Sequence, residues 1–217
     1  MKRIALSVLW ALFCSGALFS QIPLVTTVQI IKAEDARRYD AGFERLMRSP
    51  NAEARRRAAL AAGRIGDARA VPLLATLLES DPSEPVRAMA AFALGEIESV
   101  AAADAILKAL DPKVPGAVRA RAIEAAGKIA AANAKSEKAK ALSAAIANSL
   151  RQEFKESSVG FARLSLTAVL RARPTGAEEV VRQYLSFTDP NVVADALNTL
   201  ARLRAKNANR DARDLLA

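Results

Sequence analysis

The residues best suited to chemistry in this chain are arginines that recur at a constant spacing. Arg55, Arg87 and Arg119 stand 32 residues apart, and Arg56 lies beside the first of them. A guanidinium group presents several N–H donors in a planar fork and pairs well with a carboxylate. The spacing therefore predicts a row of positive charges. This row either joins consecutive structural units through ion pairs or forms a basic binding surface.

The sequence holds few of the residues that catalysis or metal binding requires. Its 217 residues include no histidine and one cysteine, Cys14. This excludes histidine-based catalytic triads and histidine metal sites, and the chain has no glycine-rich phosphate loop or nucleophile motif. The Asp and Glu residues stand at expected helix N-termini and on polar faces, where electrostatics accounts for them. We therefore expect no catalytic residue, no bound metal and no cofactor.

The arginines belong to a longer repeat, which indicates the elements that position them. Residues 51–82 and 83–114 align at the same spacing, and the register continues into a third copy. A fixed period of this length is typical of a supersecondary unit that stacks on copies of itself. Each copy reads as two helices punctuated by Gly, Asp and Pro. Abundant Ala and Leu, with only 5% aromatic residues, favour closely packed helices over a sheet.

Three glycines recur with the same period inside the expected first helices. They are Gly63, Gly95 and Gly127. A glycine inside a helix costs about 1 kcal/mol relative to alanine, so its repetition needs a compensating reason. We interpret these glycines as positions where two helices cross too closely for a side chain. A role in ligand binding is the less favoured interpretation.

The third copy departs from the period. Residues 115–158 are longer than the preceding copies by about 11 residues, and their second helix is expected from Ser136 to Phe154. Insertions in a solenoid usually emerge on one face. This insertion is either a structural spacer or a projection specific to a partner. Two weaker copies follow at 159–189 and 190–217.

The N-terminal segment is of a different kind. Residues 1–20 combine a short positive start, an apolar core and small residues, which is the layout of a secretory signal peptide. Cleavage is expected after Ala17 or Ser20. The alternative is a retained membrane anchor, since no charge occurs between Arg3 and Lys32. If the segment is removed, the mature chain has no cysteine and no thiol chemistry.

Two short segments connect this N-terminal part to the repeats. Residues 21–34 are predicted to be a short extended lead-in. Residues 35–48 are predicted to be a helix that caps the start of the stack, because their apolar residues lie on one stripe.

The repeated motif resembles HEAT repeats, specifically the short bacterial type first associated with phycobilin lyases. In the second copy the motif reads Val86-Arg87-x-x-Ala90-Ala91-x-Ala93-Leu94-Gly95-x-Ile97. The match is strong over 51–129 and fair over 159–204. The resemblance implies a right-handed α-solenoid whose inner surface holds partners. It also implies that lyase activity is confined to a few members of the family, and nothing in this sequence supports that activity.

We expect an all-α fold, a right-handed α-solenoid of about five HEAT-like helical hairpins with roughly ten or eleven helices. The function expected is that of a non-enzymatic, exported scaffold, periplasmic or in the cell envelope, which binds another protein. The 32 Lys and Arg exceed the 23 Asp and Glu and give a net charge of +9, which favours an acidic partner surface. Nucleic acid is not expected as a partner, because the basic residues are not interleaved with stacking aromatic residues.

Two alternative functions remain open at this point. The chain is similar to the N-terminal HEAT-repeat part of larger bacterial envelope enzymes, such as cyclophilin-type peptidyl-prolyl isomerases, whose catalytic domain would then follow. The net charge also fits a protein held at a membrane surface by anionic lipid, and high salt would release such a protein. A firmer membrane association is expected only if the N-terminal segment is retained.

Overall fold

Helices account for all regular structure in the part of the chain that the computed structural model describes, residues 21–154 and 158–214. The predicted all-α fold is thereby confirmed. In order, the helices are α1 (Leu24–Asp35), α2 (Ala41–Met47), α3 (Ala52–Ile65), α4 (Val71–Ser80), α5 (Glu84–Ile97), α6 (Ala103–Ala109), α7 (Gly116–Ala132), α8 (Glu137–Glu153), α9 (Val159–Ala172), α10 (Ala177–Gln183), α11 (Pro190–Leu203) and α12 (Ala208–Asp214). Three short 3-10 turns, η1 (Ala68–Ala70), η2 (Val100–Ala102) and η3 (Tyr184–Ser186), adjoin α4, α6 and α10.

Residues next to the helix ends determine where these helices begin and end. The Asn51 side chain accepts hydrogen bonds from the backbone N–H groups of the first turn of α3, and Asp189 does the same for α11. Such caps satisfy donors that have no partner within the helix. Helix α3 ends at Gly66, whose φ of 78° is the left-handed conformation that glycine adopts without strain. The chain then turns back directly into the second helix of the pair.

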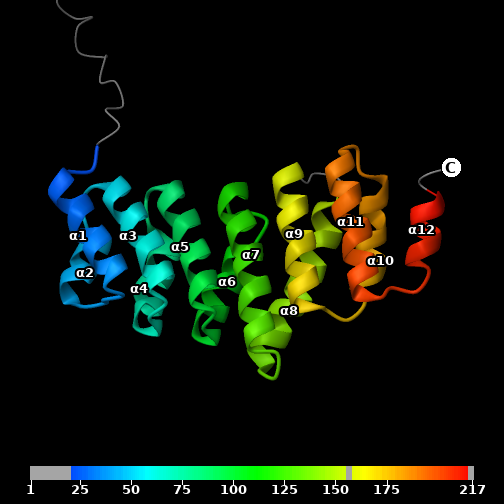
Figure 1. Ribbon diagram of the computed structural model, residues 1–217, viewed down its shortest axis with the longest axis horizontal. Coiled ribbons are helices and arrows are strands. Elements are labelled where there is room, and N and C mark those ends of the chain that lie inside the picture. Colours follow the sequence, from blue (N-terminus) through cyan, green and yellow to red (C-terminus); the bar gives the residue numbers. More distant parts are fainter. Residues whose placement is uncertain (1–20, 155–157, 215–217) are drawn as a thin grey trace, which may run out of the picture.

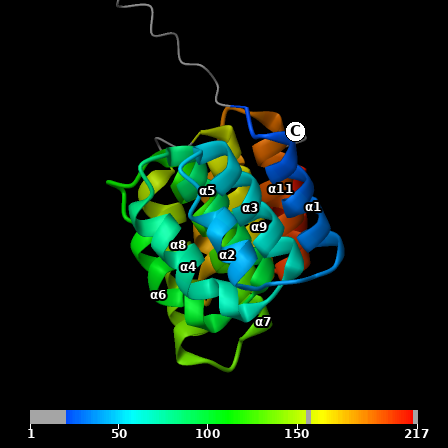
Figure 2. The ribbon, with the colours of Figure 1, turned by 90° about the vertical axis from the view of Figure 1, so that its left-hand side faces the viewer.

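The helix pairs stack side by side into an elongated array of two layers. Helices α1, α3, α5, α7, α9 and α11 pack against one another in sequence and form the first layer (Figure 1). Helices α2, α4, α6, α8 and α10 lie behind them and form the second layer, and α12 lies beside α11 at the end of the array (Figures 1 and 2). The five predicted copies correspond to the pairs from α3–α4 to α11–α12. Each pair is in contact with its neighbours along the array, as expected for a solenoid.

Small side chains fill the space within the first layer. In α3, for example, Ala58, Ala59, Ala61 and Ala62 are fully buried. Alanine permits short distances between helix axes, and its burial costs no side-chain entropy. Larger side chains, such as Leu74 of α4 and Ile106 of α6, fill the space between the layers.

The start of the array differs from the prediction. Residues 21–34, expected to be an extended lead-in, form most of α1, which packs on α3 through Ile30 and Ala33. The capping helix expected at 35–48 is shorter and begins after Asp40, whose side chain accepts the N–H of Phe43. Helix α1 was missed because apolar residues occupy both its buried and its exposed face, so the sequence shows no single apolar stripe.

The longer third copy forms the two longest helices. Helices α7 and α8 each have 17 residues, and the end of the pair where they meet extends beyond its neighbours (Figure 1). Ser136 stands at the N-cap of α8 and Phe154 at its C-cap. The Tyr184 hydroxyl donates a hydrogen bond of 2.9 Å to the carbonyl of Leu150 in α8, and the Phe154 ring packs edge-on against Tyr184. These contacts join the extended helix to the following pair.

Candidate functional site

The recurrent arginines lie at the turns through which the chain enters the first helix of each pair. Each of them donates from Nη1 to a backbone carbonyl of its own turn. The acceptors are Ser49 for Arg55 (2.8 Å), Asp81 for Arg87 (2.7 Å), and Pro112 (2.7 Å) and Val114 (3.1 Å) for Arg119. The common function of the three residues is therefore to satisfy carbonyl groups between consecutive repeats.

The guanidinium group of Arg55 forms hydrogen bonds within the protein through all three of its nitrogen atoms. Its Nε and Nη2 atoms donate to the two carboxylate oxygens of Asp81 at 2.7 and 2.9 Å, and the two side chains are 12% and 2% exposed. Burial alone would raise the pKa of Asp81. The hydrogen bonds from Arg55 and from the Ser83 N–H outweigh it, so the pKa lies below its ordinary value of 3.8. Arg55 is thus part of the fold and is not available to a partner.

Arg119 is engaged in a similar way by a different acid. Its Nη2 donates to Glu153 at 2.7 Å, and its guanidinium lies over the ring of Phe161 at 5.7 Å. Both charged side chains are largely buried, at 18% and 14% exposure. Glu153 belongs to the last turn of the long α8, so the insertion in the third copy supplies this carboxylate. Arg119 therefore links the third pair to the fourth.

Arg87 and Arg56 differ from these two arginines. Arg56 pairs with Glu53 on the same helix, where both side chains remain well exposed. Arg87 makes no side-chain ion pair with any residue in the described ranges, and its contact with the Asp81 carbonyl leaves Nε and Nη2 unused. Of the four arginines predicted to bind a partner, Arg87 is the one whose guanidinium is open to a ligand.

The three recurrent glycines lie where successive helices of the first layer touch. A Cβ atom built on Gly63 would stand 2.8 Å from the Cα of Ala93. The corresponding distances are 2.7 Å from Gly95 to Ala125 and 2.7 Å from Gly127 to Ala168. Side chains do not approach a backbone this closely, so each position admits only glycine at the present spacing of the helices.

Ion pairs neutralise the outer face of the first layer over α1, α3, α5 and α7. Glu34 of α1 accepts hydrogen bonds from Arg57 and Arg64 of α3 at 2.6 and 2.8 Å. Lys128 of α7 bonds to Glu96 of α5 at 2.5 Å and to Glu124 at 2.8 Å. The predicted basic surface is therefore not continuous here, because carboxylates of adjacent helices cancel much of the positive charge.

Uncompensated positive charge gathers near the other end of the array. Arg171 and Arg173 at the end of α9, and Arg202 and Arg204 at the end of α11, are exposed. Within residues 21–154 and 158–214 no carboxylate pairs with any of these four. Cations at helix C-termini interact favourably with the helix dipole, which is sufficient reason for them to be there.

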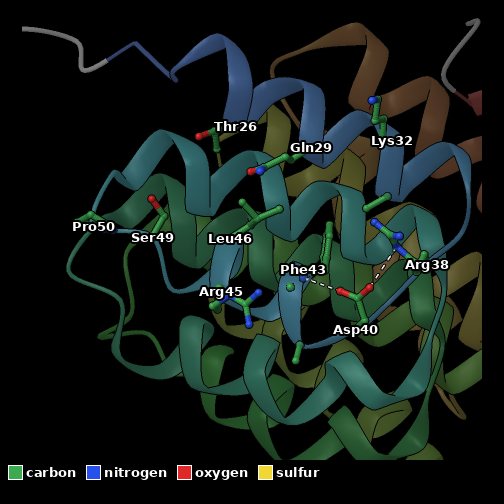
Figure 3. A pocket seen from close by; sticks show the side chains of 13 residues that line it. Thr26, Gln29, Lys32, Arg38, Asp40, Phe43, Arg45, Leu46, Ser49 and Pro50 are labelled. Atoms are coloured by element: carbon green, nitrogen blue, oxygen red, sulfur yellow. Dashed lines mark hydrogen bonds and ion pairs between the residues drawn. The ribbon is translucent and has the colours of Figure 1, made fainter.

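An open pocket lies between α1 and α2 at the N-terminal end of the array. Its volume is about 660 Å³, and it is lined by Thr26, Gln29 and Lys32 of α1 and by residues of α2 and its flanking turns (Figure 3). On the far side, Arg38 and Asp40 form an ion pair of 3.1 Å (Figure 3). The lining combines these polar side chains with apolar ones such as Phe43, Leu46 and Pro50.

The outer face of α1 continues this end surface and is apolar. Its side chains Leu24 and Val25 are 79% and 65% exposed, and Val28 and Ile31 follow at 39% and 42%. Sequence analysis missed this surface because it assigned the segment to an extended lead-in. Leu24, Val28 and Ile31 recur at i, i+4 and i+7, which is a helical spacing, but the apolar residues of the buried face, Ile30 and Ala33, obscure it in the sequence.

Within residues 21–154 and 158–214, no three Cys, Asp or Glu side chains gather in a way that could hold a metal ion. In the same ranges, no helix combines the length and apolar character needed to cross a bilayer. The predicted signal peptide, residues 1–20, lies outside the described residues.

Comparison with models of protein families identifies the family to which these repeats belong. The model of HEAT repeats matches residues 40–127 and 77–160, which together cover more than half of the chain. This chain belongs to the HEAT repeat family. The matched part includes α3 to α8 and the arginines and glycines described above, so the predicted family is confirmed. No curated protein matches the chain significantly.

Solved structures with the same fold extend the similarity to most of the HEAT array. One is the complex of CpcE and CpcF of phycocyanin lyase from Nostoc sp., with a TM-score of 0.61 and 19% identity. The match covers 85% of this chain and 66% of the lyase chain, slightly under two thirds of its length. Another is an engineered protein with a TM-score of 0.56 and 21% identity, covering 80% of this chain and 83% of that one. At these identities the similarity shows the helical fold alone.

Proposed function

We propose that this HEAT-repeat chain is an exported, non-enzymatic scaffold of the cell envelope that binds another protein. The observation that carries the proposal is the outer face of α1. Four of the five large apolar side chains that are exposed in the described residues lie on this one helix, namely Leu24, Val25, Val28 and Ile31. A terminal repeat normally presents a polar outer face to water. A contiguous apolar face at this end is typical of a surface that a partner covers.

The surroundings of this face have the composition of a protein interface. The apolar residues are bordered by the pocket between α1 and α2, which contributes the basic residues Lys32, Arg38 and Arg45. Interfaces commonly combine an apolar centre with a polar rim that sets orientation and specificity. The chain's net charge of +9 adds a preference for an acidic partner.

Three further observations support the proposal. The layout of residues 1–20 is that of an export signal. The sequence has no histidine, and its one cysteine lies inside that signal, which leaves no thiol or imidazole for catalysis in an exported chain. The structural neighbour from Nostoc was solved as a complex of two proteins, CpcE and CpcF, which shows one use of this fold in protein association.

A photo-crosslinking amino acid at Val28 tests the proposed binding surface. The control carries it at Asn198, an exposed position on α11 near the other end of the array. In cells that produce the protein naturally, we expect Val28 to crosslink to a second, distinct protein and Asn198 not to do so. Crosslinks from Val28 only to another copy of this chain, or only to lipid, would contradict the proposal.

Intact mass spectrometry of the protein from fractionated cells tests export and the alternative function. We expect the protein in the envelope fraction, shorter than the full chain by its first 17 or 20 residues. A cytoplasmic protein that keeps these residues would refute export. A much larger mass would favour the alternative, in which these repeats belong to a larger envelope enzyme such as a cyclophilin-type prolyl isomerase.

A further inference from the structure

A second pocket lies around Arg87, in the middle of the array. It has a volume of about 440 Å³ and opens between the ends of α4 and α6 and the start of α7. Its walls are largely apolar and include Leu78, Ala109 and Val114. Arg87, Lys108 and Lys113 bring positive charge into it. The pocket is remote in sequence from α1 and uses none of the residues of the end surface.

The turn between α6 and α7 explains why Asp111 does not pair with Arg87. Asp81 precedes Arg87 by six residues, whereas its counterpart Asp111 precedes Arg119 by eight. In this longer turn the Asp111 side chain accepts the backbone N–H of Lys113 at 2.8 Å and remains exposed. It does not pair with Arg87 as Asp81 pairs with Arg55. The extra residues instead place Lys113 and Val114 in the pocket wall.

The charges around the pocket leave an excess of positive charge. Asp81 is occupied by both Nε and Nη2 of Arg55, and Glu79 pairs with Lys108 at 3.0 Å. Arg87 and Lys113 form no ion pair with a carboxylate of residues 21–154 or 158–214, although Arg87 lies close enough to Asp81 to help lower its pKa. Asp111 lies on the turn and is not part of the lining. A carboxylate that enters the pocket would therefore meet net attraction, and the apolar walls would contact the carbon atoms beside it.

We propose that this pocket binds an acidic side chain of the partner protein, with Arg87 as the anchoring residue. The unused Nε and Nη2 atoms of Arg87 present the same edge that Arg55 offers to Asp81, so a carboxylate fits it in bidentate geometry. Lys113 adds a second charge at the rim. The apolar walls suit the methylene groups of a glutamate, or an apolar residue next to it. This inference rests on the proposed function only in taking the carboxylate from a protein.

Short peptides test the pocket independently of α1. The probes are acetyl-Leu-Glu-Leu-amide and its glutamine counterpart, titrated into the isotope-labelled chain while backbone amide and arginine Nε–H shifts are followed by NMR. We expect the glutamate peptide to shift Arg87, Lys113 and Val114 and to bind at least about tenfold more tightly than the glutamine peptide. Equal affinity for the two peptides, or shifts that avoid these residues, would overturn the proposal.

Variants separate the pocket from general electrostatic attraction. Arg87→Gln is expected to abolish the preference for glutamate, and Lys113→Gln, a change at an exposed residue, to reduce the affinity by about two- to fivefold. Arg171→Gln is the matched control, since it removes an exposed and unpaired arginine far from the pocket, and it should leave binding unchanged. An equal loss in Arg171→Gln would overturn the proposal, as would undiminished binding by Lys113→Gln.

Two further outcomes distinguish this inference from others. If inorganic phosphate displaces the glutamate peptide at lower concentration than the peptide itself binds, the pocket is a general anion site and the inference fails. A positive crosslink at Val28 together with no carboxylate binding would leave the scaffold function standing and reject only the pocket. The reverse result would reject the α1 surface and keep the pocket.

Discussion

Gly95 of α5 lies directly against the backbone of Ala125 in α7. A methyl group on Gly95 would stand 2.7 Å from the Cα and 2.9 Å from the Cβ of Ala125. Neither obstacle can rotate away, so relief requires the two helices to separate. The same relationship holds for Gly63 with Ala93 and for Gly127 with Ala168. These three positions therefore limit how far α3, α5, α7 and α9 stand apart within the first layer.

The first prediction concerns this contact. Gly95→Ala is expected to lower the free energy of unfolding by about 1–3 kcal/mol, because overpacking outweighs the higher helix propensity of alanine. Gly160→Ala in α9 is the matched control, since a Cβ there meets nothing within 4 Å, and it should be neutral or stabilising by up to about 1 kcal/mol. Urea denaturation followed by circular dichroism measures both. Equal stability of the two variants would show that the helix spacing adjusts freely.

The second prediction concerns the buried ion pair of Arg55 and Asp81. Arg55→Ala leaves the Asp81 carboxylate buried without its main partner and should destabilise the protein by about 3–5 kcal/mol. Lys138→Ala removes an exposed pair with Asp104, whose side chains are 51% and 67% exposed, and should cost less than about 1 kcal/mol. Thermal and urea unfolding provide the comparison. A small effect of Arg55→Ala would mean that water reaches Asp81 readily.

The third prediction concerns the stability of the fold at low pH. The pKa of Asp81 is lower in the folded state than the ordinary value of 3.8, so its ionised form stabilises the fold. This stabilisation is fully present above about pH 4 and is lost as the pH falls through the folded pKa. Asp81→Asn should be less stable than the parent at pH 7 and should show a weaker fall in stability between pH 4 and pH 2. Parallel pH profiles of the two proteins would contradict this role of Asp81.

The fourth prediction concerns the junction between α8 and the following pair. Tyr184→Phe removes the hydroxyl that donates to the Leu150 carbonyl at a fully buried position. Loss of this bond should cost about 1–2 kcal/mol, because the carbonyl loses a donor away from water. Retention of the ring should preserve the packing against Phe154. Thermal unfolding of this variant beside the parent measures the effect, and an unchanged midpoint would mean that water replaces the hydroxyl.

Much of the fold could be predicted from the sequence because its signals are local and repeated. Helix caps, turn residues and the spacing of buried alanines depend on residues only a few positions apart. The 32-residue period then indicated that similar units stack on one another. The recurrent Gly95 and Gly127 even indicated where those units touch, since glycine within a helix requires a specific reason.

The function of each recurrent arginine could not be predicted in the same way. Arg55, Arg87 and Arg119 occupy equivalent positions, yet Asp81 engages the first, Glu153 the third and no described carboxylate the second. These acids lie 26 and 34 residues from the arginines they bind. Their approach depends on the length of the α6–α7 turn and on the extension of α8.

The sequence by itself therefore determined the helices of the repeats, their pairing and the repeating contacts between them, since all three follow from residue types at regular short spacing. It did not reveal α1. Only the tertiary structure decided which charges cancel and which remain open. In the folded chain Glu34 lies beside Arg57, and Asp81 pairs with Arg55. Arg87 lies in the wall of a pocket. The physical reason is that the energy of a charge depends on the groups within a few ångströms of it, and the packing of distant segments brings those groups there.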